Sequence, residues 1–415
     1  MNKVLKIQIT LFIILGASFY IFFEPKFHPD SQGYIDYHSM RSVGYSFLIY
    51  LLKKNIAYVY LSQIILSIIS CFFFLRVLKK IFSINNLSFF FISLVLILVS
   101  LNTSLNILSG SFSFSFYLIF LALCLTSLSE KKTFYIFLAF FPAIVGILIR
   151  PQLIFLIPSF LIFLFYSFYL TREKKLFLIF PMIFLLFYIP PKINNYFNLK
   201  LNNVDVAITD TFNQLLILPL FVSNQDISNY FYEDDLKTLF YESFQCAYSK
   251  GLTKQQALKN RENWLYELET HSFPIKNCVN TTIDNFYSDQ NQTFKEIQSK
   301  KLFFATFSAH LKSDPFNLLN SYIDKYSSAF FNKYYLGIFV IFSFSIIIYL
   351  VFFRSLQILI ILTFIISHYS NLLVICLGAP MLTRYKFYTE IVLILIFSSI
   401  IINFLNKKTY KNDKI

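Results

Sequence analysis

The sequence predicts an all-α polytopic membrane protein with about ten transmembrane helices, and composition is the first reason. Of the 415 residues, 56% are hydrophobic and only 14% are charged, whereas a soluble domain usually carries about 25% charge. Apolar runs such as FFFISLVLILVSL recur along the chain at lengths that suit one bilayer crossing. The ten-residue segments of alternating polarity that mark an outer-membrane barrel are missing from the sequence.

Ten apolar runs predict the organisation of the chain. Residues 1–191 form an N-terminal membrane module of seven spans with a first outer loop at 24–56, residues 192–333 form an extracytoplasmic domain, and residues 334–415 form a C-terminal membrane module of three spans with a basic tail. No small-residue cleavage site follows the first run, so we expect a retained span. The predicted spans are 5–23, 57–75, 87–105, 112–129, 133–150, 152–170, 175–190, 334–353, 355–376 and 388–405.

The positive charges predict the orientation. Lysine and arginine clusters precede the first span and follow the second, fourth, sixth, eighth and tenth, which places all of them on one side of the membrane. By the positive-inside rule this side is the cytoplasm. We therefore expect a multi-pass protein of the inner (plasma) membrane, with cytoplasmic termini and a periplasmic segment 192–333. That segment holds 14 basic and 15 acidic residues, so the net charge of +14 reflects topology and argues against a nucleic-acid partner.

The segment 192–333 is too long for a connector and is expected to fold as a mainly helical domain. Residues 308–331 have the pattern of an amphipathic helix that enters the eighth span, with Asp314 as its N-cap and Pro315 at its first position. Cys246 and Cys278 also lie in this segment, and on an oxidising face they could form a disulfide.

The first outer loop contains a dense polar cluster in the stretch HPDSQGYIDYHSMRS. A carboxylate at the membrane edge, Asp30 or Asp36, can serve as a general base toward a hydroxyl group. Alternatively, His28 and His38 could join the two aspartates as metal ligands, which would bring in a divalent cation. Their spacing lacks the tight repeats of a structural zinc site, so no metal is assigned.

Several cations are expected on the same outer face as this loop. Arginine offers a forked donor for phosphate, and its charge persists at any relevant pH. Together with a base, such cations suit transfer from a lipid-linked phosphosugar, because the departing phosphate carries charge that they stabilise. Charges at span ends can also serve only to snorkel toward the interface. The cations are Arg41, Arg150, Arg384 and Lys386.

The order of these motifs resembles GT-C glycosyltransferases, which are polytopic enzymes that use polyprenyl-phosphate sugars. The resemblance rests on Asp30-Ser31-x-x-Tyr34, Arg41-Ser-Val-Gly44-Tyr45, Ile149-Arg150-Pro151 and Arg384-Tyr385. It implies that Asp30 is the base and that Arg384 contacts phosphate, with Tyr34 and Tyr385 beside the substrate. The chain departs from the family at Ser46, where proline is usual, and at Ser31, where many mannosyl- and aminoarabinose-transferases have a second acid; Asp36 therefore stays an alternative base.

The sequence thus predicts a membrane glycosyltransferase with a polyprenyl-phosphate sugar donor, a glycan, lipid or protein acceptor, and an inverting reaction comparable to inverting glycoside hydrolysis. An O-antigen polymerase or ligase is the nearest alternative and would not depend on Asp30. A lipid or polysaccharide flippase or transporter is a second alternative, although the internal repeats of such folds are missing from the sequence. A catalytically silent assembly factor is a third.

Overall fold

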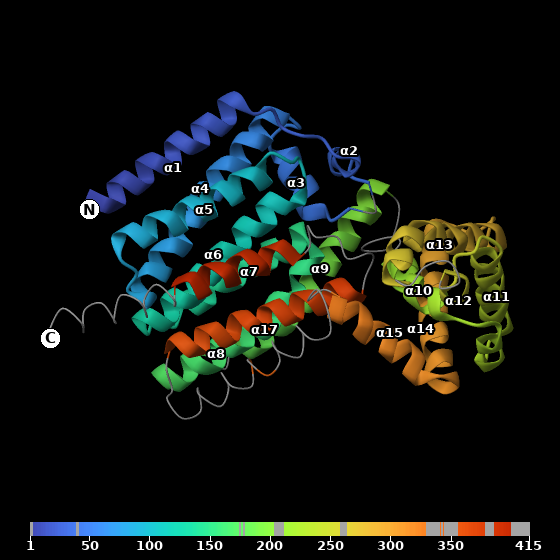
Figure 1. Ribbon diagram of the computed structural model, residues 1–415. Helices are drawn as coiled ribbons and strands as arrows, with labels where there is room; N and C mark the ends of the chain where they lie inside the picture. The colour runs from blue at the N-terminus through green and yellow to red at the C-terminus, as the bar shows by residue number, and fades with distance from the viewer. Residues whose placement is uncertain are drawn as a thin grey trace. The chain divides into compact units, whose positions relative to one another are not determined.

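The computed structural model describes residues 3–38, 41–173, 176, 179–202, 211–257, 264–328, 341, 343, 356–377 and 386–399 (Figure 1). The regular elements in these ranges are helices. They fall into two compact units. Unit 1 comprises 1–202, 343–371 and 387–415, and unit 2 comprises 203–342 and 372–386.

The protein is an all-α membrane protein. In the described ranges, five helical segments are long and apolar enough to cross a bilayer, and they match the predicted spans 57–75, 87–105, 112–129, 152–170 and 355–376. They are α4 (Ile56–Phe82), α5 (Asn86–Ser104), α6 (Ser109–Glu130), the continuous segment Pro151–Thr171 made of η1 (Pro151–Phe155) and α8 (Leu156–Thr171), and α17 (Leu356–Leu377).

The other predicted spans are reproduced less completely. Two of them match shorter apolar helices, at Lys6–Phe22 within α1 (Lys3–Phe22) and at α7 (Phe134–Ile149). Residues 386–399 are helical and cover most of the tenth predicted span. The predicted span 334–353 lies outside the described residues, apart from positions 341 and 343.

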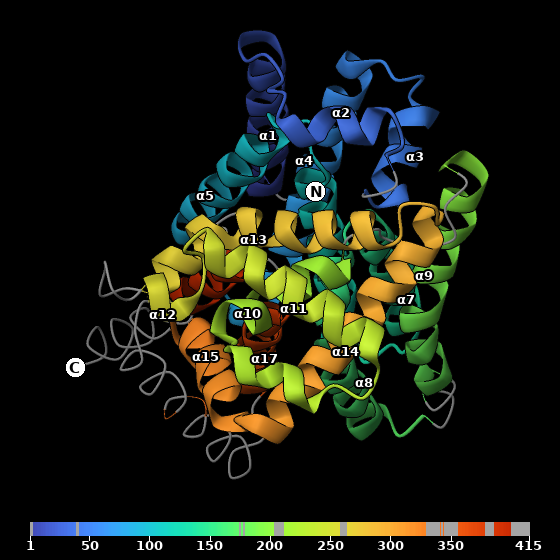
Figure 2. The ribbon, with the colours of Figure 1, turned by 90° about the vertical axis from the view of Figure 1, so that its right-hand side faces the viewer.

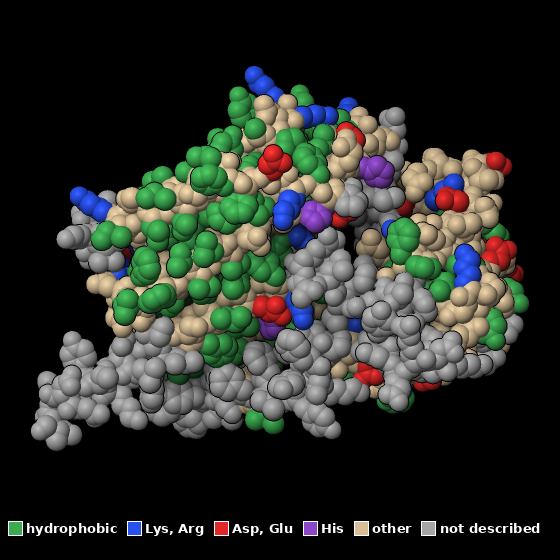
Figure 3. Space-filling model, turned by 45° about the horizontal axis from the view of Figure 1, so that its top comes forward, with side chains coloured by type: hydrophobic (Ala, Val, Ile, Leu, Met, Phe, Trp, Pro, Cys, Tyr) green, Lys and Arg blue, Asp and Glu red, His purple; other side chains and the backbone are tan. Residues whose placement is uncertain are grey.

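The core of unit 1 is built around α6, which is mostly buried and packs against α4, α5, α7 and α8. Serines lie where α4, α5 and α6 meet: Ser104 Oγ is 2.9 Å from Ser67 Oγ and 2.9 Å from Ser111 Oγ. Small side chains allow close approach of helices in a membrane, and their hydroxyls hydrogen-bond between helices. The outer surface is apolar, as the space-filling view shows over the helices at the left of Figure 3.

One end of unit 1 gathers the basic turns. Lys80 at the end of α4 and Lys132 after α6 each place Nζ 3.4 Å from the Glu130 carboxylate. Thr133, at the start of α7, donates a 2.8 Å hydrogen bond to Glu173, which follows α8. The turns after three of the predicted spans therefore meet at the same end, as the alternation of charge requires.

The predicted first outer loop is largely helical and lies at the opposite ends of these helices. It contains α2 (Pro29–Ile35) and α3 (Val43–Leu51), which pack against each other. The helix α9 (Ile179–Asn202) packs on α3 and α7.

The helix α9 runs past residue 191, where the first module is predicted to end. It continues through Pro190 and Pro191 to Asn202, where the first stretch of unit 1 ends. Its second half is tied to unit 1 because Asn194 Oδ1 accepts from the Val43 backbone N–H (2.9 Å) and Asn202 Nδ2 donates to the Tyr37 carbonyl (2.9 Å). These contacts hold a polar stretch that hydropathy assigns to the outer domain.

Unit 2 is a bundle of helices (Figure 2). Its core is built mainly of leucine, isoleucine and phenylalanine side chains. Gly251 ends the α11 region with a φ of +72°, a backbone conformation that favours glycine. The elements are α10 (Thr211–Val222), η3 (Gln225–Tyr230), α11 (Asp234–Ser249), α12 (Lys254–Ala257), α13 (Trp264–Phe286), α14 (Gln292–Ser313) and α15 (Pro315–Ser328).

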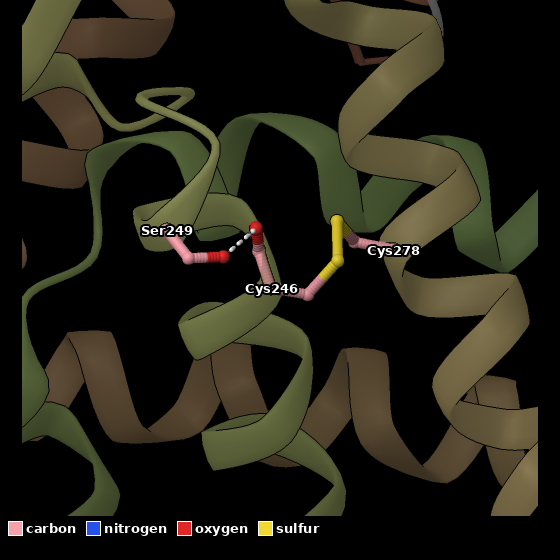
Figure 4. Close-up of a disulfide and its surroundings, with 3 residues drawn as sticks. All are labelled: Cys246, Ser249 and Cys278. Atoms are coloured by element: carbon pink, nitrogen blue, oxygen red, sulfur yellow. Dashed lines mark hydrogen bonds between the residues drawn. A yellow bond between two sulfur atoms is a disulfide. The ribbon is translucent and has the colours of Figure 1, made fainter.

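A disulfide links α11 and α13 in unit 2. Cys246 and Cys278, the pair singled out in the sequence, have Cα atoms 5.7 Å apart and are bonded (Figure 4). The predicted helix at 308–331 is divided in the structure. Residues up to Ser313 belong to α14, and α15 begins at Pro315, where the Asp314 carboxylate accepts from the Asn317 backbone N–H (3.1 Å) as the predicted cap.

Candidate functional site

The short helix α2 is fixed to the chain segment that precedes α6. The His28 backbone N–H donates to Ser31 Oγ (2.9 Å), and Ser31 Oγ donates to the Ile107 carbonyl (2.8 Å). The His28 ring places Nε2 2.8 Å from Asn106 Oδ1. Ser31 is fully buried, so its bond to Ile107 is shielded from water, and together these bonds hold α2 at one place and orientation.

Asp30 and Arg41 form an ion pair at the centre of the site. Arg41 Nη2 donates to Asp30 Oδ1 at 2.6 Å, and the two side chains are 30% and 32% exposed, respectively. A charge-assisted hydrogen bond of this kind is short and directional, so it orients the carboxylate. Gly33 leaves room for the arginine, because a Cβ at that position would lie 3.1 Å from Arg41 Nε.

Tyr34 links this ion pair to α6. The Arg41 guanidinium carbon lies 5.6 Å from the centre of the Tyr34 ring, within the range of a cation–π contact. The buried ring packs edge-on against Tyr45 at 5.0 Å, and its hydroxyl is 3.1 Å from Ser109 Oγ. Gln63 of α4 donates to the Tyr45 hydroxyl (3.2 Å), so α2, α3 and α4 converge on the start of α6.

The first turn of α6 is close to both arginines of the site. Its N-cap is Leu108, whose apolar side chain makes no capping hydrogen bond. The N–H groups at a helix start carry partial positive charge and suit anions. A Cβ at Gly110 would lie 3.6 Å from Arg150 Nη1. Arg41 is therefore linked to this turn by Tyr34, which contacts both, whereas Arg150 lies directly beside the turn.

Arg150 is held by an aromatic residue from near the end of the chain. Its Nη1 donates to the Tyr388 hydroxyl at 2.6 Å, and its guanidinium carbon is 5.3 Å from the Tyr388 ring centre. The same hydroxyl is 3.0 Å from Ser113 Oγ and donates to the Gly110 carbonyl (3.3 Å). This arrangement fixes the guanidinium beside the first turn of α6.

The helix α3 presses on the end of α7 immediately before Arg150. Ser42 Oγ donates to the Ile149 carbonyl. A Cβ at Gly44 would lie 2.6 Å from the main-chain carbonyl of Leu148, closer than real Cβ contacts come. The α3–α7 crossing therefore depends on glycine at position 44, and it positions the Arg150 backbone relative to α2 and α3.

A network of polar side chains begins at Gln152, two residues after Arg150 in the chain. Gln152 Nε2 donates to Asn371 Oδ1 (2.7 Å), and Asn371 Nδ2 donates to Thr389 Oγ1 (3.0 Å). His368 Nδ1 is 2.9 Å from the same threonine oxygen. These bonds tie η1, α17 and residues 386–399 together, and they give the intramembrane His368 a structural partner.

The other predicted site residues are placed as follows. Asp36 is exposed and accepts a 2.7 Å hydrogen bond from Gln32 of its own helix. His38 is exposed as well, and within the described ranges no three His, Cys, Asp or Glu side chains gather as a metal site requires. The structure therefore does not assemble the metal alternative, because His28 is turned to Asn106 and Asp30 to Arg41.

The predicted site residues near the carboxyl end, from Arg384 to Lys386, are only partly among the described residues. Arg384 and Tyr385 lie outside the described residues, and Lys386 is half-buried and belongs to unit 2. Sequence reasoning assigned no role to Tyr388, Ser109 or Gly110. The pair Ser109-Gly110 at the start of this mainly apolar helix is the signal that could have indicated the helix terminus.

Comparison with known proteins gives no relative. No family model, no curated protein sequence and no solved structure matches the chain.

Proposed function

We propose that this chain is a membrane glycosyltransferase of the GT-C type, which transfers a sugar from a polyprenyl-phosphate donor to a hydroxyl of a glycan, lipid or protein. The observation that supports it best is that an aspartate and two arginines gather near one helix start: Tyr34 links the Asp30–Arg41 pair to Ser109, and Arg150 lies beside Gly110. A base beside a cluster of phosphate-binding groups is what this reaction requires.

In the proposed reaction, Asp30 takes the proton from the acceptor hydroxyl as the hydroxyl oxygen attacks the anomeric carbon of the donor sugar. The bond from that carbon to the phosphate oxygen breaks, the phosphate leaves with its electron pair, and the configuration inverts. Asp30 suits this role better than Asp36, because Arg41 orients its carboxylate whereas Asp36 is exposed and bonded within its own helix.

The cations bind the donor in this proposal. Arg150 and the first turn of α6 bind the phosphate and stabilise the charge that grows on it as it departs. The donor phosphate or sugar is also bound by Arg41, Arg384 and Lys386. Tyr34 and Tyr385 lie beside the bound donor. Residues 192–333 select the acceptor.

The proposal includes the finer topology. It has ten spans, both termini in the cytoplasm, and the site on the extracytoplasmic face of the inner membrane. The meeting of Lys80, Lys132 and Glu130 at one end of unit 1, with Arg150 at the opposite end of α7, agrees with this assignment. Labelling of single introduced cysteines from outside intact cells tests it, since residues near position 38 should react and residues near position 132 should not.

The test of the activity compares two aspartates in one loop. A strain that lacks the gene is complemented with the wild type, with Asp30→Asn or with Asp36→Asn, and its surface glycans are analysed by mass spectrometry. The Asn side chain keeps an acceptor oxygen for Arg41 but loses the base. General-base catalysis contributes roughly 10²–10⁴-fold, so Asp30→Asn should lose the added sugar while Asp36→Asn retains it.

Other results would point elsewhere. Loss in Asp36→Asn alone would move the base to Asp36. Full activity of both variants would refute the carboxylate mechanism and favour a polymerase or ligase. Movement of lipid across vesicles without a new glycosidic bond would favour a flippase or transporter.

A further inference from the structure

The helix α15 of unit 2 is amphipathic in the reverse sense to a helix on a water-soluble domain. Leu318, Ser321 and Lys325 form its buried face, and Ser327 in its last turn is buried as well. Its opposite face exposes Phe316 (71%), Leu319 (54%) and Ile323 (46%). These three residues are three and four positions apart, so they form one stripe along the helix.

The orientation of α15 is fixed by its buried face. Leu318 is part of the hydrophobic core of unit 2. The helix α15 packs against α10 and α14 (Figure 2). Lys254 Nζ donates to Ser321 Oγ (3.2 Å), which gives the buried hydroxyl a partner. Rotation of α15 to bury the apolar stripe would expose Leu318 and break this bond. The stripe therefore belongs to the outer surface of unit 2.

The chain that follows α15 indicates what covers this stripe. The helix ends at Ser328, and an apolar run of span length, YYLGIFVIFSFSIIIYLVFF, begins at position 334. The five intervening residues reach at most about 18 Å even when fully extended. Ile323 lies within two turns of the end of α15, so the apolar stripe approaches the bilayer surface at that end.

We propose that α15 lies in the interface of the lipid bilayer, with Phe316, Leu319 and Ile323 inserted at the boundary between headgroups and acyl chains. Helices that carry an apolar face of this kind bind the interface in proportion to the apolar area that they bury. Unit 2 is thereby anchored to the membrane surface along a helix and not only through the ends of its spans. The proposal rests on the membrane character of the chain and is independent of the proposed reaction.

Tryptophan fluorescence in the full-length protein tests this proposal. The chain holds one tryptophan, Trp264, which is first replaced by phenylalanine. Leu319→Trp and Ile323→Trp are then made separately, with Tyr241→Trp as the control, because Tyr241 is 41% exposed on α11. Each protein is reconstituted in vesicles of phosphatidylethanolamine with a minor share of phosphatidylglycerol, with or without bromine on the acyl chains close to the headgroups.

In brominated vesicles, the emission of Leu319→Trp and Ile323→Trp should fall about twofold, with little quenching by iodide in the water. Tyr241→Trp should show the opposite behaviour. Quenching of the α15 positions by iodide alone would overturn the proposal, because the stripe would then face water. Resistance to both quenchers would also overturn it, because protein would then cover the stripe. Equal quenching of Tyr241→Trp by brominated lipid would do so as well, since the contact would not be specific to α15.

Discussion

Replacement of Gly44 by alanine is a test in which two physical effects have opposite signs. Gly44 lies in α3, and helix propensity alone favours alanine over glycine by about 1 kcal/mol. The structure opposes this gain. The new Cβ would lie 2.6 Å from the carbonyl carbon and oxygen of Leu148 and 2.7 Å from the Ile149 nitrogen. All three are main-chain atoms, which cannot turn aside as a flexible side chain would.

The expected loss of stability in Gly44→Ala follows from the separation of α3 and α7 that the new methyl group requires. Ordinary Cβ contacts begin near 3.4 Å, so α3 and α7 must separate by most of an ångström. Overpacking of a well-packed interface costs about 1–3 kcal/mol. The same separation would weaken the adjacent hydrogen bond from Ser42 to the Ile149 carbonyl, and such a bond contributes about 1 kcal/mol. After the propensity gain is subtracted, the expected net destabilisation is about 2 kcal/mol, or a fall in Tm of about 4–8 °C.

The assay uses the buried free cysteines of the chain. Cys71, Cys124 and Cys376 are buried, so a thiol-reactive dye reports unfolding of the purified protein in detergent. Gly110→Ala is the matched control, because a Cβ there would meet its nearest neighbours at 3.5 and 3.6 Å, which is ordinary contact. Its Tm should stay unchanged or rise. A Tm for Gly44→Ala that equals or exceeds that of Gly110→Ala would refute the close approach of α3 to α7.

Three further predictions concern other parts of the molecule. His310 is fully buried, and desolvation lowers its pKa below the ordinary value. As the pH drops below about 6.5, the unfolded chain therefore binds more protons than the folded protein, and the Tm should fall. In His310→Gln this fall in Tm should be smaller. The double variant Cys246→Ala, Cys278→Ala lacks the disulfide, which closes a loop of 32 residues. By the chain-entropy relation its free energy of unfolding should be lower by about 3–4 kcal/mol. Denaturant unfolding measures this loss, and an unchanged midpoint would contradict the prediction. Tyr388→Phe removes the hydroxyl that holds Arg150, and because hydrogen bonds to charged groups contribute about 1.5–3 kcal/mol to stability, the Tm should fall by a few degrees. In the proposed reaction the KM for the donor should rise as well, because the Arg150 guanidinium is then no longer held in place.

Hydropathy predicted where several membrane helices lie but not where they end. The helix α4 continues seven residues beyond the predicted end at 75, because Leu78 and Phe82 are buried against the protein. The helix α9 continues beyond 190 because Asn194 and Asn202 find partners in α3 and after α2. Hydropathy measures transfer to lipid, and a helix can persist wherever protein contacts support it.

The cap of α15 was predictable for a different reason. Asp314 and Pro315 act on their own neighbours in the chain, so their effect is encoded within three residues. The Asp30–Arg41 pair lies at the limit of such local reasoning. Its partners are eleven residues apart with a turn between them, and the sequence indicated a base and a cation without indicating that they touch.

The contacts that assemble the candidate site were beyond prediction because many of their acceptors are main-chain carbonyls. Ser31 donates to the carbonyl of Ile107, Ser42 to that of Ile149, and Gln63 to that of Leu108. Every residue type carries such a carbonyl, so the accepting positions have no signal in the sequence. Only the donors are specific, and a buried serine or glutamine is equally consistent with helix packing in a membrane. It follows that substitutions at Ile107 or Ile149 which preserve side-chain volume should leave the site intact, whereas Ser31→Ala should loosen α2 and reduce activity without any change at the charged residues.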